Sequence, residues 1–277
     1  MNILVPNLGS TSLKWQIIEF PSERTLARGR AERVTDYKEA IAAIPVAEFP
    51  VDAVAFKAVL AGAKYRGTFR VDMGVIEAMK QFLPAAPAHN KIYLNGIMAF
   101  REALPQATLV AAFETEFHAT MPEHAVRYGV PKRWFTEGEV QHYGFHGASH
   151  QYVAGRVPEI VGGPVKRLVS CHLGGSSSMC AILDGRSVDT TMGFSPQSGL
   201  ENATRHGDLD VFAVLYMMER YGWTTQQVRE QLAGEGGLAG LSGIAGGDVR
   251  DLVAGVEAGN TDAQLALDVF VYEVLWK

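Results

Sequence analysis

The chain contains one short phrase twice, and no other feature of the sequence constrains the fold as strongly. The first copy, Asn7-Leu8-Gly9-Ser10-Thr11-Ser12, follows an apolar run at 3–5, and the second, His172-Leu173-Gly174-Gly175-Ser176-Ser177, follows a similar run at 168–171. Each copy precedes an alternating, strand-like stretch. A small-residue turn between two strands exposes backbone N–H groups and hydroxyls that can hold phosphate oxygens. Single turns of this kind are common, but two in matched settings predict a duplicated fold with a nucleotide or phosphate site between its halves.

Size and composition narrow the class of protein. The 277 residues suffice for two domains, each with its own core. A formal net charge of −5 disfavours a nucleic-acid-binding protein, which would carry a basic surface. The two cysteines, Cys171 and Cys180, cannot build a disulfide framework and favour a reducing compartment. The N-terminus lacks the basic region of a secretory signal, and no apolar stretch reaches membrane-spanning length. We therefore expect a cytoplasmic protein that binds neither nucleic acid nor membrane.

Hydrophobic periodicity predicts a mixture of strands and helices. Strands are expected at 2–6, 13–20, 27–34, 51–60, 108–113, 167–172, 178–183 and 187–191, the last two joined by a hairpin turn at Asp184-Gly185. Helices are expected at 37–44, 71–82, 92–104, 209–221, 225–232, 249–258 and from 262 onward. The glycine-rich stretch 234–247 is predicted to be a mobile or ligand-facing loop.

Longer motifs connect the repeat to a known family. The stretch from Asn7 to Lys14 resembles the first signature of the acetate kinase family, Asn-x-Gly-Ser-Ser-Ser-x-Lys, and the stretch 143–150 resembles the second. The stretch 170–210 is similar to the family core, and the matches continue in the family's order along essentially the whole chain. The resemblance implies an α/β fold of two duplicated actin-like (ribonuclease H-like) domains, at 1–142 and 143–277, with a central cleft.

The resemblance also implies an activity and its residues. It implies a phosphotransferase that moves the γ-phosphoryl group of ATP, with Mg²⁺, to a short-chain carboxylate, or catalyses the reverse reaction, in a homodimer. The family's transition-state stabilisers match His146 and Arg205, and an arginine suits this role because its planar fork binds phosphate or carboxylate bidentately. Asn7 matches a position near the metal. The positions that match phosphate or nucleotide contacts are Ser10, Ser12, Lys14, His172, Gly174, Gly175, Ser176, Asp248 and Arg250.

Three matched positions depart from the family. Its substrate-contacting arginine falls on Lys57, which keeps the charge but not the fork, and its catalytic aspartate falls on Glu114, which is one methylene longer. An asparagine of the nucleotide motif falls on Gly175, so an amide donor is lost. Because charge is preserved at the first two positions, we interpret the site as shifted rather than inactive.

The matched substrate pocket is also altered. Family positions around the methyl group of the substrate fall on Val59, Ala88, Phe145 and Pro196, and the usual leucine is Ala88 here. The smaller side chain leaves room for a longer acyl chain, since each buried CH₂ contributes ~0.8 kcal/mol. We therefore expect propionate or a somewhat larger acid as the substrate rather than acetate.

The final helix is expected to continue to the last residue without a cap, so that its apolar face lacks a partner. Members of the family are longer, and the resemblance implies a second domain that is incomplete here. Two other hypotheses therefore stay open: a non-catalytic homologue that binds a partner, and a kinase of the same superfamily with another acceptor.

The candidate residues also have plainer interpretations. His142, His146 and His150 recur every four residues, as ligands of a helical metal site would, but Gly144 and Gly147 disfavour such a helix. Without its motif Arg205 would be an ordinary ion-pair partner. The other plain interpretations are a solvated strand residue (Lys14), turn hydroxyls (Ser10 and Ser12) and helix-start charges (Asp248 and Arg250).

Overall fold

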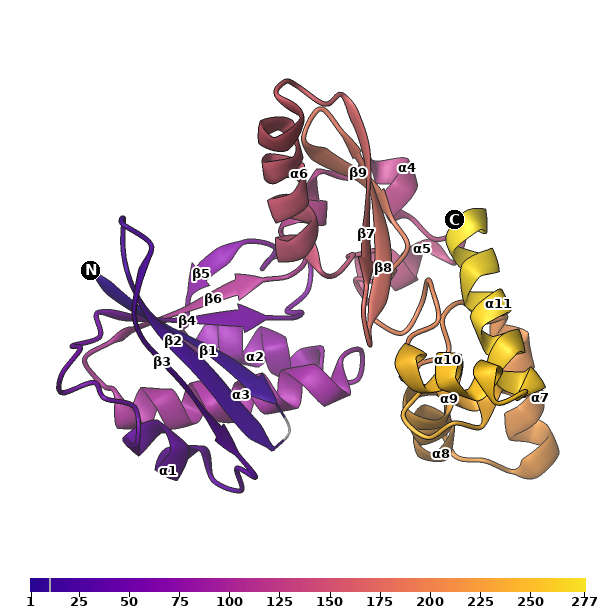
Figure 1. The fold of residues 1–277 in the computed structure, drawn as a ribbon, viewed down its shortest axis with the longest axis horizontal. Helices are drawn as coiled ribbons and strands as arrows, with labels where there is room; N and C mark the ends of the chain where they lie inside the picture. Colours follow the sequence, from indigo (N-terminus) through magenta and orange to yellow (C-terminus); the bar gives the residue numbers. More distant parts are fainter. Residues whose placement is uncertain (10) are drawn as a thin grey trace. The chain divides into compact units, whose positions relative to one another are not determined.

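The computed structural model describes residues 1–9 and 11–277, without the side chains of 87–89. The chain forms two compact units, unit 1 at Met1–Glu116 and unit 2 at Phe117–Lys277 (Figure 1). The units divide earlier than the boundary expected at 142 because the intervening residues pack within unit 2. Thr120 shows this packing, since its hydroxyl donates to the backbone oxygen of Ser187 at 2.8 Å.

Unit 1 is built on one mixed sheet with the order β3-β2-β1-β4-β6-β5. The strands are β1 (Asn2–Gly9), β2 (Ser12–Glu19), β3 (Arg24–Glu32), β4 (Ala53–Ala58), β5 (Thr68–Arg70) and β6 (Thr108–Phe113). β1, β4 and β6 are parallel neighbours, whereas β1, β2 and β3 form an antiparallel meander. The carboxyl ends of the three parallel strands therefore lie along one edge of the sheet, where open α/β sheets bind their ligands.

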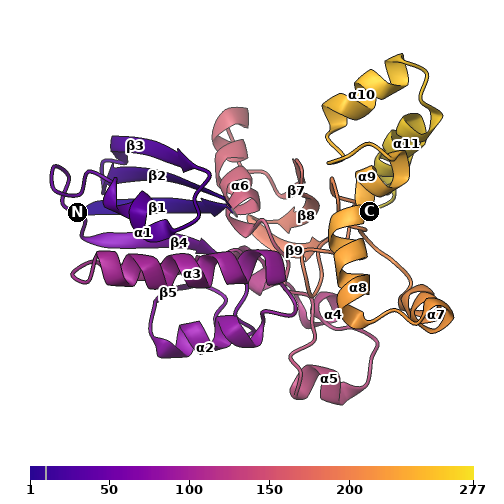
Figure 2. The same cartoon turned by 90° about the horizontal axis from the view of Figure 1, so that it is seen from below.

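Helices cover one face of this sheet (Figure 2). They are α1 (Tyr37–Ala42) and α3 (Pro87–Ala103), with α2 (Met73–Gln81) packed against α3. Val75, Ile76 and Met79 are the buried residues of α2, as its helical spacing predicts. In α3, a Cβ at Gly96 would collide with the Leu8 side chain, so this glycine allows the helix to pack directly on β1.

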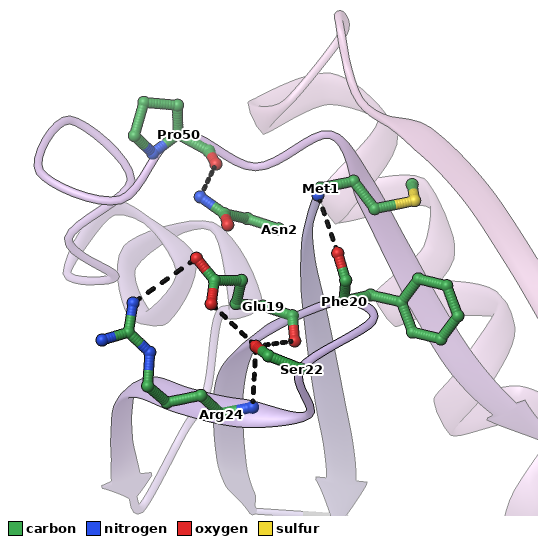
Figure 3. Close-up of polar contacts among 7 residues, drawn as sticks. All are labelled: Met1, Asn2, Glu19, Phe20, Ser22, Arg24 and Pro50. Atoms are coloured by element: carbon green, nitrogen blue, oxygen red, sulfur yellow. Dashed lines mark hydrogen bonds and ion pairs between the residues drawn. The ribbon is translucent and has the colours of Figure 1, made fainter.

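The far end of the meander is closed by polar contacts at the chain terminus (Figure 3). The Met1 ammonium donates to the Phe20 backbone oxygen at 3.0 Å, and the Ser22 hydroxyl donates to the Glu19 carboxylate at 2.7 Å. The Asn2 side chain donates to the Pro50 backbone oxygen at 2.8 Å, which ties β1 to the segment before β4. These contacts lie at the end of the sheet opposite the carboxyl ends of the parallel strands. They connect β1 to the turn after β2 and to the segment before β4.

Asn90 fixes the loop that follows β4. Its side chain is buried, and its amide donates to the backbone oxygens of Leu60 at 2.8 Å and Met79 at 3.1 Å. One amide group therefore ties the ends of β4 and α2 to the first turn of α3. Sequence analysis did not single out this residue, because the pattern of a lone asparagine gives no indication of tertiary partners.

Unit 2 repeats the antiparallel meander in a second sheet of order β7-β8-β9. The strands are β7 (Arg167–Leu173), β8 (Ser177–Leu183) and β9 (Arg186–Thr190), and α6 (Gly147–Val161) packs along β7 (Figure 1). The predicted hairpin turn is confirmed, since Asp184 and Gly185 both have positive φ angles. Both copies of the repeated phrase thus join the first two strands of a meander, as predicted.

The rest of unit 2 is helical. Before α6 come the short helices η1 (Phe117–Thr120), α4 (Glu123–Val126) and α5 (Lys132–Thr136), which sequence analysis did not predict. After β9 come α7 (Val211–Tyr221), α8 (Thr225–Glu230), the π-turn η2 (Gln231–Glu235), α9 (Gly237–Ser242), α10 (Val249–Glu257) and α11 (Thr261–Trp276). None of the described helices is both long enough and apolar enough to cross a lipid bilayer.

The prediction that 234–247 forms a loop throughout is wrong for 237–242, because this segment is α9. Leu238 of α9 is buried with Leu252 and Ala266 in a small core, and this tertiary packing overcomes the low helix propensity of the surrounding glycines. α11 buries Ala263 and Ala266, whereas Tyr272, Leu275 and other large apolar side chains near its end are exposed.

Replacing Asn90 with alanine should destabilise unit 1. The variant loses two side-chain hydrogen bonds and leaves buried backbone oxygens without a donor, at a cost of about 3 kcal/mol. Urea unfolding should show the loss, and Asn95→Ala, which alters an exposed asparagine on the same helix, should change little. Equal stabilities of the two variants would contradict the role assigned to Asn90.

Candidate functional site

The predicted residues of unit 1 lie at the carboxyl ends of its parallel strands. Lys57 is the last but one residue of β4, and Glu114 directly follows β6. The two strands are hydrogen-bonded neighbours, so the Lys57 ammonium meets the Glu114 carboxylate at 2.6 Å. The glutamate side chain is only 9% exposed, whereas that of Lys57 is 55% exposed. The pair therefore presents its ammonium to solvent and keeps its carboxylate in the protein.

The first copy of the repeated phrase lies at the same edge of the sheet. Asn7 and Lys14 are cross-strand partners on β1 and β2, and both are exposed. Gly9 and Ser12 close the hairpin, and a Cβ at Gly9 would meet the Ser12 hydroxyl at 2.5 Å. Ser10 and the side chain of Ala88 lie outside the described residues. Val59 directly follows β4 and is buried.

Tyr93 is a further residue of this edge, which sequence analysis passed over. It lies on α3, and burial, together with the nearby Glu114 carboxylate, raises the pKa of its phenol to about 12. A contact with the Leu8 backbone opposes this rise in pKa. Tyr93 thus links the end of β1 to the surroundings of Glu114. The sequence shows it only as one of several apolar residues in a helical pattern.

In unit 2, His146 is held by an unusual backbone. Its φ of 56° lies in the left-handed region, immediately before α6. The preceding turn needs Gly144, whose φ is 73° and whose Cβ would approach the His118 ring to 2.5 Å. Non-glycine residues adopt this conformation at a cost, and they occur mainly where the surrounding structure imposes it, as at functional sites. Phe145 and Pro196, predicted pocket residues, are both buried.

His146 is one of three neighbouring histidines with serine partners. His146 stacks on His172, with ring centroids 4.1 Å apart, and His150 lies 6.5 Å from each of them. The Ser178 hydroxyl contacts both His146 Nδ1, at 2.8 Å, and His150 Nε2, at 2.9 Å. His172 Nδ1 contacts the Ser149 hydroxyl at 2.9 Å. The nucleotide-motif histidine and the predicted catalytic histidine are thus direct neighbours.

His150 is the buried member of this group. Burial, with smaller contributions from the neighbouring His118 and His172, lowers the pKa of its imidazole to about 3. Its ring is therefore neutral at ordinary pH. The helix that a zinc site at 142, 146 and 150 would need begins only at Gly147. Within the described residues, no three histidine, cysteine, aspartate or glutamate side chains are arranged to hold a metal ion.

Arg205 lies in a loop that is fastened to the second copy of the repeated phrase. The Ser177 N–H donates to the buried Asn202 Oδ1 at 2.6 Å, and the Ala203 N–H donates to the Gly175 backbone oxygen at 3.0 Å. Arg205 itself donates from Nη1 to the Pro196 backbone oxygen at 2.9 Å. These bonds set the position of the Arg205 backbone relative to the turn at 174–176. Asn202 was not singled out from the sequence, although it lies next to the matched motif.

A cavity of about 490 Å³ opens beside this turn. Its walls come from the turn, the Arg205 loop, α9, the start of α10 and α11. The lining residues are Leu173, Gly174, Gly175, Ala203, Leu238, Gly246, Gly247, Asp248, Val249 and Phe270. A Cβ at Gly175 would meet nothing within 4 Å, so the turn presents bare backbone to this space. Backbone N–H groups and an apolar wall together suit a nucleotide.

Asp248 and Arg250 were predicted either as nucleotide contacts or as charges at the start of a helix. Asp248 caps α10 by accepting from the Arg250 N–H at 2.9 Å, and it pairs with the Arg250 guanidinium at 2.6 Å. Hydrogen bonds from Arg250 lower the pKa of this carboxyl to about 2. Asp248 lines the cavity, whereas Arg250 is exposed outside its lining. The structure thus brings Asp248 to the wall of this cavity, whereas Arg250 serves as the partner of the cap.

The two units have the folds of a phosphotransferase with duplicated α/β domains. The Acetokinase family model matches residues 41–276, and the chain belongs to this family of enzymes, which use a carboxylate as phosphoryl acceptor. It is 36% identical to the acetate kinase of Geobacillus kaustophilus over 305 aligned positions, covering 98% of this chain and 77% of the relative.

Solved structures agree with this assignment. The propionate kinase of Francisella tularensis matches with a TM-score of 0.91 at 28% identity, covering 99% of this chain and 78% of that one. The acetate kinase of Porphyromonas gingivalis matches with a TM-score of 0.85 at 30% identity, covering 99% of this chain and 77% of that one. The predicted family and its actin-like fold are therefore confirmed.

The neutral His150 predicts a pH dependence of stability. The pKa of His150 is about 3 in the folded chain and near 6.5 in the unfolded chain. Between these pH values the unfolded chain binds a proton at His150, whereas the folded chain does not. The free energy of unfolding should fall by about 2 kcal/mol more between pH 7 and pH 5 in the wild type than in His150→Gln. Urea unfolding at both pH values measures this difference.

The control for this prediction is His124→Gln, which replaces an exposed histidine of α4 in the same unit. This variant should keep the wild-type pH dependence. If His150→Gln and the wild type lose the same free energy between the two pH values, His150 is not the group that resists protonation.

Proposed function

We propose that this protein transfers the γ-phosphoryl group of ATP to a short-chain carboxylate, giving an acyl phosphate and ADP, or catalyses the reverse reaction. One observation supports the proposal most strongly. The loop that carries Arg205 is hydrogen-bonded to the turn at 174–176, and this turn borders the cavity of about 490 Å³. In this proposal, the turn would hold the phosphates of the nucleotide, and the loop would bring the Arg205 guanidinium close to them. Family membership, with acetate and propionate kinases among the relatives, supports the carboxylate as acceptor.

In the proposed reaction, a carboxylate oxygen forms a bond to the γ-phosphorus while the bond to the bridging oxygen of ADP breaks. Charge is spread over the three equatorial phosphoryl oxygens in the transition state. Arg205 would place its planar fork on two of these oxygens, and His146 would donate to them from its ring. Phosphate oxygens of the nucleotide would accept from the N–H groups of Gly175 and Ser176, because that of Gly174 already donates to the Ser176 backbone oxygen at 3.2 Å.

Lys57 and Glu114 would act on the acceptor. The exposed ammonium of Lys57 would hold the substrate carboxylate, while Glu114 keeps that ammonium in place at 2.6 Å. An ammonium is a point charge with three rotatable donors, so it attracts a carboxylate without fixing its plane. The resemblance to the family assigns the contacts with the acyl chain to Val59, Ala88, Phe145 and Pro196.

The proposed reaction uses Mg²⁺, which neutralises phosphate charge when it is bound. Magnesium takes oxygen ligands and is usually held by one or two protein groups together with substrate phosphates. Asn7 fits this requirement, because its exposed side chain supplies an amide oxygen at the carboxyl end of β1, near the first small-residue turn. We also infer a homodimer located in the cytoplasm, an inference supported by family membership.

Hydroxylamine trapping tests the proposed activity. The purified chain with ATP, Mg²⁺ and a short acid should yield a hydroxamate, because hydroxylamine reacts with an acyl phosphate but not with the free acid. Arg205→Lys should lower kcat about 100-fold, since the bidentate donor is lost at the transition state. Arg229→Lys, at an exposed position of α8, is the matched control and should leave kcat unchanged. ATP binding without hydroxamate formation from any acid would favour the non-catalytic hypothesis.

Acyl-chain length provides a second test. If Ala88 enlarges the pocket, kcat/KM should be higher for propionate or butyrate than for acetate, by about fourfold for each buried CH₂. Ala88→Leu should reverse the order by refilling that space. The series of acetate, propionate, butyrate and valerate measures the preference, and a clear preference of the wild type for acetate would rule the enlarged pocket out.

A further inference from the structure

A row of four buried or half-buried side chains leads to His146 from the core of unit 2. The Ser170 hydroxyl on β7 contacts His150 Nδ1 at 2.9 Å, and His150 Nε2 contacts the Ser178 hydroxyl on β8 at 2.9 Å. Ser178 in turn contacts His146 Nδ1 at 2.8 Å. Ser170, His150 and Ser178 are at most 3% exposed, so water does not compete for these bonds.

The row can be protonated in two ways. Each serine has one O–H to donate, and a neutral imidazole has one N–H and one acceptor nitrogen. Because His150 is neutral, it donates at one end and accepts at the other. Either every bond points from Ser170 toward His146, or every bond points from His146 toward Ser170. A mixed row would require Ser178 to accept from both rings, and its own buried proton would then have no acceptor among the described residues.

The surroundings of Ser170 distinguish the two directions. Among the residues that the structure describes, His150 Nδ1 is the hydrogen-bond partner of the Ser170 hydroxyl. If His150 donated to Ser170, the buried Ser170 proton would have no acceptor there, and such an orphaned group costs free energy. If Ser170 donates to His150, each proton of the row has an acceptor. The second direction is therefore favoured.

We propose that Ser170, His150 and Ser178 form a directed hydrogen-bond relay that fixes neutral His146 as its Nε2–H tautomer. In this arrangement Ser178 donates to His146 Nδ1, so the ring proton must be on Nε2. His150 and Ser178 are then positioning residues for His146. The consequence for catalysis rests on the proposed function, in which His146 donates to the transferring phosphoryl group.

The relay explains why a donor is available without a charged ring. A neutral imidazole whose proton was on Nδ1 would offer a lone pair at Nε2, which would repel phosphoryl oxygens. With the relay in place, His146 presents an N–H from Nε2 even when it is neutral. The left-handed backbone of His146 serves the same end, because it places the ring where Nδ1 meets Ser178.

Nuclear magnetic resonance of the full chain tests the relay without substrate. Histidine labelled with ¹⁵N is observed by long-range ¹H–¹⁵N correlation at about pH 8.5, above the ordinary imidazole pKa. Missing signals in His146→Asn assign the ring. The wild type should show a protonated Nε2 and an unprotonated Nδ1 for His146. A protonated Nδ1 in the wild type would overturn the proposal, whatever the variants do.

Variants then separate the relay from general packing. Ser178→Ala should convert His146 to a mixture of tautomers, and Ser170→Ala should shift it partly in the same direction. Ser187→Ala is the matched control, because Ser187 is an equally buried serine whose hydroxyl contacts His118 Nδ1 at 2.9 Å. It should change the His118 signals and leave those of His146 as they are. An unchanged His146 tautomer in a folded Ser178→Ala would refute the relay.

Kinetics of the same variants connect the relay to the reaction. Ser178→Ala should lower kcat about tenfold with little change in KM for ATP, whereas Ser187→Ala should keep kcat. If the chain forms no acyl phosphate, the proposed function fails while the spectra still decide the relay. If the spectra show the expected tautomer but kcat does not fall, the relay exists without the catalytic consequence.

Discussion

Both units depend on a turn that joins two antiparallel strands with no large side chain over its backbone. In unit 1 the turn closes between Gly9 and Ser12, and in unit 2 it runs through Gly174 and Gly175. A side chain at Gly9 would require the Ser12 hydroxyl to turn aside, whereas the second turn has open space over Gly175. The two copies of the phrase thus share their place between strands but differ in the surroundings of their glycines.

The charged pair at the sheet edge can be understood as one change rather than two. The resemblance of the sequence to the family implies arginine and aspartate where this chain has Lys57 and Glu114. Lysine is shorter than arginine, and glutamate is one methylene longer than aspartate. The two differences would offset one another in reach, and the side chains meet at 2.6 Å. An ammonium lacks the planar fork of a guanidinium, so the proposed acceptor site would keep its charge but have less control over the orientation of a carboxylate.

Much of the fold could be predicted from local pattern. All eight predicted strands exist, because alternation and turn residues are local signals. Helix α9 could not be predicted, because its buried Leu238 packs with Leu252 and Ala266, which are distant in sequence. Motifs indicated His146 and Arg205 as functional residues. Asn90, which fixes the loop after β4, and Asn202, which fastens the Arg205 loop, bond to segments distant in sequence, and no short pattern contains that information.

The glycines of the stretch 234–247 show how such distant constraints appear in a sequence. A Cβ at Gly237 would collide with the backbone oxygen of Asn202, and one at Gly247 would collide with that of Ala203. Both oxygens belong to the loop that carries Arg205, and both accept bonds from α9, at 3.0 Å from Leu238 and 2.9 Å from Ala239. Glycine is therefore needed for close backbone packing rather than for mobility. This packing holds the Arg205 loop against the second small-residue turn. The glycine-rich stretch therefore helps to set the position of Arg205, although the two are distant in sequence.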